Sequence, residues 1–347
     1  MGKQFGGKIT RQLLEKYAQS PHWDGEKFVN LEETIMEMNL GKVPGLLMNR
    51  YFNNVQREPS SALPIIPFNE QNFLEASNKM KFIWYGHSVM LIRMNNKTIL
   101  IDPMLGPDAS PVAPFSTKRF STNSLDLISD FPEIDVVLLT HDHYDHLDFA
   151  SFQKLKPKVK QYFVALGLGR HLMDWGIDKN DITEFDWWEN KLFANINITF
   201  TPSRHFSGRG LRDRFKSLWG GWTLKTENEN IYFSGDGGFG NHFKEVGEKL
   251  GPFDFGFMEC GQYNELWHLM HMYPEESVHA GMEAKVKMIM PVHWGAFSLA
   301  MHAWSDPVDR FVDEAIKCKI NYIVPLLGDL IDLNQVASSI KWWLDYI

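Results

Sequence analysis

Three histidines and three aspartates fall within eight residues, in the run IDVVLLTHDHYDHLD at positions 134–148. His141 and His143 are two apart, so a turn could aim both at one ion, with Asp145 and His146 facing a second position nearby. Imidazole and carboxylate groups suit zinc and similar divalent ions. A lone histidine beside a strand would be interpreted as an ordinary packed residue. This density instead predicts a binuclear metal site.

Each of four predicted strands is followed by a potential metal ligand. VVLLT precedes His141, ITFTPSR precedes His205, IYFSG precedes Asp236 and KMIMPV precedes His293. The continuous apolar run VVLL is typical of a strand that is buried on both faces. Ligands at the same end of neighbouring strands converge on one crevice, which is the usual place for a site on an α/β sheet.

The rest of the chain alternates strands and helices. Residues 81–103 contain three β-rich runs with a turn at Asn95 and Asn96, and helices are predicted at 147–155, 274–284 and 306–318. His87 and Asp102 stand at the ends of the early strands. Each could either orient a metal ligand or cap a turn. An amphipathic helix near residues 10–19 could pack on the core or contact a membrane or partner.

Composition narrows the class of partner and the compartment. Lys and Arg number 35 against 43 Asp and Glu, for a net charge of −8, which argues against nucleic acid as a partner. Cys260 and Cys318 are far apart and outside any CxxC pattern, so neither a disulfide framework nor a cysteine zinc site is expected. The charged N-terminal stretch lacks the apolar core of a signal peptide. A cytoplasmic protein is predicted, with peripheral membrane contact as an option.

The ligand pattern of this chain resembles that of the metallo-β-lactamase superfamily of hydrolases: HxHxDH, then a later His, then the Asp of SGD, and then a final His. The resemblance implies a four-layer αββα sandwich, with two mixed sheets face to face and helices outside. The mixed, proline-punctuated composition of residues 1–80 predicts an extension packed on a hydrolase domain at 81–347. One metal would take His141, His143 and His205, and the other would take Asp145, His146 and His293, with Asp236 bridging them.

Two divalent ions about 3.5 to 4 Å apart could share a hydroxide and clamp the attacked oxygen, so hydrolysis at neutral pH is the expected chemistry. Zinc is the preferred cofactor, although iron and manganese accept the same ligands. The oxygen-reducing diiron members of this superfamily carry a glutamate at the second ligand position, where this chain has His143. This difference disfavours an oxidoreductase. Asp142 lies inside the motif but outside the ligand pattern, so we expect it either to brace the loop or to hydrogen-bond a ligand histidine.

Several longer segments resemble one branch, the N-acyl-phosphatidylethanolamine-hydrolysing phospholipase D family and its bacterial relatives. These are WYGHSVMLI, TILIDPML, TPSRHFSGRG, KSLWGGWTL, YFSGDGGFG, MYPEESV and PVHWGAF, between residues 81 and 298. The resemblance implies a phospholipid phosphodiester substrate. It also places His271 near the catalytic metals, so Asp145, Asp236 and His271 are the expected catalytic residues.

Two groups of side chains bear on the substrate. A basic group could hold an anion or be a solvated loop; it comprises Arg204, Arg209, Arg212, Arg214 and Lys216. An aromatic and methionine group could line an acyl-chain surface or pack in the core; it comprises Trp219, Trp222, Phe239, Tyr263, Trp267, Met270, Met272, Trp294 and Phe297. The alternative functions are hydrolysis of a small soluble lactone or phosphate ester, diiron oxidoreduction, and a metal-binding scaffold without catalysis.

Overall fold

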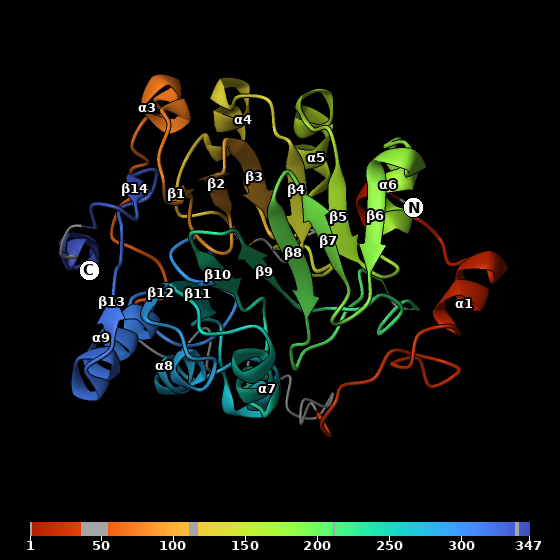
Figure 1. Ribbon diagram of the computed structural model, residues 1–347. Helices are drawn as coiled ribbons and strands as arrows, with labels where there is room; N and C mark the ends of the chain where they lie inside the picture. Colours follow the sequence, from red (N-terminus) through yellow and green to blue (C-terminus); the bar gives the residue numbers. More distant parts are fainter. Residues whose placement is uncertain (1, 36–54, 111–116, 211, 337–339) are drawn as a thin grey trace.

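The computed structural model describes residues 2–35, 55–110, 117–210, 212–336 and 340–347. Two seven-stranded mixed sheets pack face to face, and helices cover both outer surfaces (Figure 1). This is the four-layer sandwich that the sequence predicted. The part of the predicted extension at residues 36–54 lies outside the described residues, and the proposed boundary at residue 80 stays a prediction.

The first sheet has the order β14-β1-β2-β3-β4-β5-β6. Its strands are β1 (Lys81–Trp84), β2 (Met90–Met94), β3 (Lys97–Ile101), β4 (Val136–Leu139), β5 (Tyr162–Ala165), β6 (Ile182–Phe185) and β14 (Leu330–Asp332). The pairs β1·β2 and β2·β3 are antiparallel, and β3 to β6 pair in parallel. The predicted meander at residues 81–103 is therefore confirmed.

The second sheet has the order β13-β12-β11-β10-β9-β8-β7. Its strands are β7 (Asn190–Phe193), β8 (Ile196–Thr201), β9 (Gly221–Lys225), β10 (Asn230–Phe233), β11 (Phe255–Glu259), β12 (Met288–Val292) and β13 (Asn321–Tyr322). Again an antiparallel meander, β7 to β10, is followed by parallel pairing from β10 to β13. The two sheets thus repeat one arrangement, with β14 returning to the first sheet.

Helices α3 (Glu70–Leu74), α4 (Leu127–Asp130), α5 (Phe149–Leu155) and α6 (Gly169–Asp174) lie along the outside of the first sheet (Figure 1). Helices α7 (His242–Lys249), α8 (Pro274–Glu283) and α9 (Asp306–Cys318) cover the second sheet, and α1 (Arg11–Tyr17) lies at one side. Within the described residues we find no helix with the length and apolar character needed to cross a bilayer.

Strand β4 shows how the apolar run before the motif is used. Val136 and Leu138 belong to the core between the sheets, whereas Val137 and Leu139 belong to the core beneath the helices. Alternate side chains of a strand point to opposite faces, so a strand covered on both sides must be apolar throughout. This burial fixes the register of β4, and with it the position of the motif that follows.

Candidate metal centre

The loop after β4 carries the HxHxDH motif, and the loops after β8, β10 and β12 carry the other candidate ligands. All seven side chains predicted from the sequence meet at this edge of the two sheets: His141, His143, Asp145, His146, His205, Asp236 and His293. The strand-end argument therefore predicted their convergence correctly.

One group consists of three imidazoles. His143 Nδ1 lies 2.9 Å from His141 Nε2 and 3.2 Å from His205 Nε2. Burial lowers the pKa of His143 to about 4, and it also holds the pKa values of His141 and His205 well below their usual range. The three rings are therefore neutral at pH 7, which is the form that binds a metal ion.

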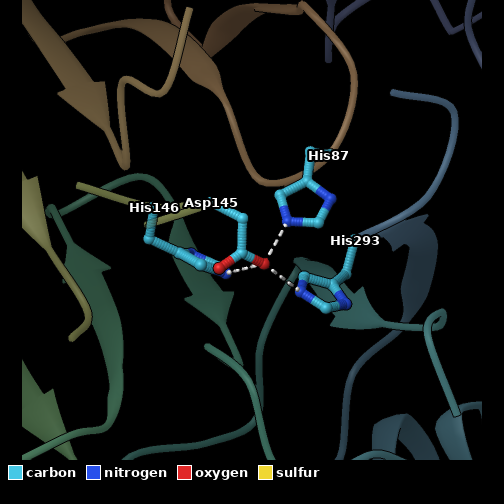
Figure 2. Close-up of side chains that lie close together, drawn as sticks. All are labelled: His87, Asp145, His146 and His293. Carbon is cyan, nitrogen blue, oxygen red and sulfur yellow. Dashed lines mark hydrogen bonds and ion pairs between the residues drawn. The ribbon is translucent and has the colours of Figure 1, made fainter. Parts of the chain in front are cut away.

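The second group surrounds Asp145 (Figure 2). Asp145 Oδ2 lies 3.6 Å from His146 Nε2, 3.4 Å from His293 Nε2 and 2.9 Å from His87 Nε2. One carboxylate oxygen and two or three imidazole nitrogens thus face a common region, as a divalent ion would require.

Asp236 lies between the two groups. Its Oδ2 is 3.0 Å from His146 Nε2 and 2.9 Å from His293 Nε2, and it is 3.8 Å from His141 Nε2 and 4.0 Å from His205 Nε2. Despite these short distances, Asp236 Oδ2, His146 Nε2 and His293 Nε2 are buried without a hydrogen-bond partner. Orphaned polar atoms of this kind are costly unless another group satisfies them. The residues therefore fit a pair of cations.

Protonation distinguishes the second group from the first. Burial alone would lower the pKa of His293, but the carboxylates of Asp236 and Asp145 outweigh it and raise the pKa to about 10. The pKa of His146 is raised well above its usual range by Asp236 and Asp145 against the same burial effect. A divalent ion that binds here would therefore compete with protons on these two rings.

The outer nitrogens of the rings have partners that fix their orientation. Asp102 Oδ2 lies 2.8 Å from His146 Nδ1 and accepts the Thr140 hydroxyl at 2.6 Å. His205 Nδ1 lies 2.9 Å from the Met270 carbonyl oxygen. Carboxylates and carbonyls in this position hold a histidine ligand in one tautomer. Of the two roles predicted for Asp102, the structure supports orientation of a ligand.

His87 belongs to this surrounding layer as well. It is fully buried, and its Nε2 donates to Asp145 Oδ2, since a carboxylate can only accept. Its backbone joins the two sheets at the site: His87 N donates to the Trp294 carbonyl at 2.7 Å, and His293 N donates to the His87 carbonyl at 3.0 Å. His87 therefore links Asp145 to the loop that carries His293.

Asp142 braces the motif loop, as expected. Its Oδ1 accepts the Gly208 N–H at 2.7 Å, and its Oδ2 lies 3.2 Å from His171 Nε2 and also accepts the Ser217 hydroxyl. Burial opposes its ionisation, but His171 and the Arg170 guanidinium outweigh burial and hold the pKa of Asp142 well below its usual range. The aspartate is a charged anchor between two loops.

The basic group after β8 serves mainly to hold the backbone. Arg209 is buried and donates to the carbonyls of Asp142 and Leu147 at 2.8 and 2.7 Å. Arg204 donates to the Phe239 carbonyl at 3.0 Å, and Lys216 to the Glu26 carbonyl. The remaining two, Arg212 and Arg214, are exposed. Of the two predicted roles, anion binding receives no support from Arg204, Arg209 or Lys216.

The aromatic and methionine group is mostly core. Seven of its nine members are buried: Trp219, Trp222, Tyr263, Met270, Met272, Trp294 and Phe297. Phe239 and Trp267 are partly exposed. Tryptophan beside a strand packed between two sheets contributes to stability through buried area. These side chains therefore form little of an acyl-chain surface.

His271 lies against both metal groups. Its ring stacks on that of His293 at 5.1 Å between centroids and meets His205 edge-on at 5.0 Å. Its Nδ1 is 3.0 Å from Glu259 Oε1. We did not predict a role for Glu259 from the sequence. The available indication was its place at the carboxyl end of a parallel buried strand, where site residues gather.

Comparison with known proteins agrees with this geometry. A family model described as a β-lactamase superfamily domain matches residues 97–294, more than half of the chain. The chain belongs to the metallo-β-lactamase superfamily. An uncharacterized protein from Mycobacterium tuberculosis is 32% identical to this chain over 330 residues, covering 94% of this chain and 88% of that protein. The predicted superfamily is thereby confirmed.

Two further similar proteins are informative. The N-acyl-phosphatidylethanolamine-hydrolyzing phospholipase D 1 of Caenorhabditis elegans is 32% identical over 286 residues, covering 75% of this chain and 79% of that protein. The structure of a metallo hydrolase from Ignicoccus hospitalis aligns with a TM-score of 0.57 at 18% identity, covering 73% of this chain and 98% of that one. The chain is thus a metallo-hydrolase of this superfamily, whose fold implies divalent metal ions.

Proposed function

We propose that the protein is a dinuclear metallo-phosphodiesterase that cleaves an N-acyl phosphatidylethanolamine-like phospholipid, with zinc as the metal. The observation that carries the proposal is Asp236 Oδ2, which lies within 4.0 Å of imidazole nitrogens from both groups. One ion is assigned to His141, His143 and His205, the other to Asp145, His146 and His293, and Asp236 to both.

Two divalent ions supply a water of lowered pKa and a positive field for charge on the phosphoryl oxygens. Asp145 and Asp236 are the proposed catalytic carboxylates that face the reacting atoms. The water oxygen bonds to phosphorus, and the bond from phosphorus to the N-acylethanolamine oxygen breaks. His271 Nε2 takes a proton from the attacking water and passes it to that leaving oxygen, because its Nδ1 is engaged by Glu259. The products are phosphatidic acid and an N-acylethanolamine.

The lipid substrate is supported by the activity named for the relative from Caenorhabditis elegans. The burial of most of the aromatic group favours a second candidate, a small soluble lactone or phosphate ester. We place the protein in the cytoplasm, where it would reach bilayer lipid by peripheral contact. The net charge of −8 speaks against nucleic acid as the diester.

The test is to incubate the zinc-loaded protein with N-acyl phosphatidylethanolamine in detergent micelles made with ¹⁸O-water, and to analyse both products by mass spectrometry. Phosphatidic acid carrying one ¹⁸O and unlabelled N-acylethanolamine are expected. Turnover of only a lactone or bis(4-nitrophenyl) phosphate would overturn the lipid assignment. Turnover of none of these esters would overturn the hydrolase proposal.

A further inference from the structure

Glu259, the last residue of β11, lies beneath the metal centre and is fully buried. Its Oε1 is 3.0 Å from His271 Nδ1 and 3.5 Å from His293 Nδ1. Its Oε2 accepts the Met272 N–H at 3.1 Å. One carboxylate thus holds two histidine rings and the segment that follows His271.

The backbone around Glu259 is fixed on both sides. Its N–H donates to Ser234 Oγ at 2.9 Å, and it pairs with Val292 in the parallel β11·β12 ladder. His293 comes one residue after Val292, so the same ladder sets the distance between Glu259 and that ring. The carboxylate therefore has little freedom to follow a moving histidine.

An ionised carboxylate only accepts hydrogen bonds, so each histidine nitrogen that faces Glu259 in this form carries its proton. His293 Nδ1 has a second acceptor, the Gly261 carbonyl at 3.4 Å. The His271 side chain makes no hydrogen bond to a second partner within the described ranges. Loss of the carboxylate would thus leave His293 held and His271 free to rotate or change tautomer.

We infer that Glu259 is a positioning residue that keeps His271 in the Nδ1–H tautomer, with Nε2 free for the reaction. The inference rests on the proposed function for its kinetic consequence, and on geometry alone for the tautomer. In this role Glu259 acts through His271, its hydrogen-bond partner. This role accounts for a carboxylate buried beneath a site whose metal ligands are already complete without it.

A double-mutant cycle tests whether Glu259 acts through His271. The zinc-loaded protein and its variants are assayed with bis(4-nitrophenyl) phosphate, and bound zinc is measured for each. Glu259→Gln is expected to lower kcat about 10- to 100-fold, the usual effect of removing such an outer partner, with KM and zinc content nearly unchanged. In the His271→Asn background the same change should alter kcat less than about twofold. The inference would be overturned if the kcat losses of the two single variants multiplied in the double variant. It would also be overturned if bound zinc fell in parallel with kcat.

A second variant tests whether the length of the Glu259 side chain matters as well as its charge. Glu259→Asp keeps the carboxylate but shortens the side chain by one methylene, so it no longer reaches His271. Its kcat should fall as far as that of Glu259→Gln, and retained activity would contradict a positioning role. Glu314→Gln is the matched control, because Glu314 is a buried carboxylate on α9 that pairs with His279 at 3.1 Å. Its kcat should equal that of the wild type.

Nuclear magnetic resonance of ¹⁵N-histidine-labelled, zinc-loaded protein tests the tautomer without turnover. The His271 signals are identified by their loss in His271→Asn. A single Nδ1–H form is expected in the wild type and a mixture of tautomers in Glu259→Gln. An Nε2–H form in the wild type would overturn the inference. If the wild type hydrolyses no phosphodiester while showing the Nδ1–H form, the proposed function fails and the positioning role stands.

Discussion

Replacement of the bridging aspartate, Asp236→Asn, is the perturbation whose effect the geometry defines best. The amide keeps the size of the side chain but removes the charge beside nitrogens of both groups. Loss of a residue that merely orients a ligand weakens metal affinity about 10- to 100-fold. Loss of a direct ligand to two ions should weaken the metal affinity of each site at least about 100-fold.

The stability change follows from linkage. At free zinc equal to about 100 times its Kd, one site adds about 2.7 kcal/mol to the free energy of unfolding. An affinity about 100-fold weaker reduces that contribution to about 0.4 kcal/mol, a loss of about 2.3 kcal/mol. At about 2 °C for each kcal/mol in a long chain, the zinc-induced rise in Tm should shrink by about 5 °C per site.

The assay is thermal unfolding over a zinc titration, with bound zinc measured by elemental analysis and phosphodiester hydrolysis measured in parallel. We expect the variant to fold, to bind less zinc and to lose hydrolysis. Asp186→Asn is the control, because Asp186 is a partly buried carboxylate that pairs with His22 at 2.8 Å after β6. An Asp236→Asn protein with two zinc ions and the full rise in Tm would refute the reasoning.

Three further outcomes are expected. Zinc binding to the His141 group should release almost no protons at pH 7, whereas zinc binding beside His146 and His293 should release about two. The reason is that the carboxylates raise the pKa values of His146 and His293. The affinity of this second ion should therefore rise with pH. A pH indicator in weak buffer measures this, and equal release at both steps would contradict it. Arg209→Ala should lower the free energy of unfolding by about 3 kcal/mol by leaving buried carbonyls unsatisfied, whereas exposed Arg212→Ala should change it by less than about 0.5 kcal/mol in urea unfolding. Phe257→Ala, in the core between the sheets, should cost about 3 to 5 kcal/mol in the same assay, and a loss below about 1 kcal/mol would contradict its packing against the facing sheet.

The sequence predicted the parts of the fold that depend on local pattern. The apolar run of β4 could be placed because burial on both faces requires apolar residues throughout the strand. The ligands that follow β4, β8, β10 and β12 could be placed because each follows the end of a predicted strand. Strand β7 was missed because Asn190–Phe193 is a short, largely exposed strand at the edge of the sheet, with no buried face to give an apolar alternation. Helix α7 was missed because it is short and contains Gly247, which weakens a helical pattern.

Roles that depend on burial could not be predicted. Arg209 and Arg214 look alike in the sequence, yet one is buried among carbonyls and the other is exposed. A run of basic residues reveals charge but not which carbonyls lie within reach. Glu259 was overlooked for the same reason, since its two histidine partners come from segments 12 and 34 residues further along the chain.

The central claim is that two ions share Asp236. Anomalous diffraction at the zinc edge, from crystals of the zinc-loaded protein, tests it most directly. We predict two peaks about 3.5 to 4 Å apart, one among His141, His143 and His205 and the other beside Asp145 and His293, with Asp236 in contact with both. A single peak, or two peaks without Asp236 between them, would contradict the claim.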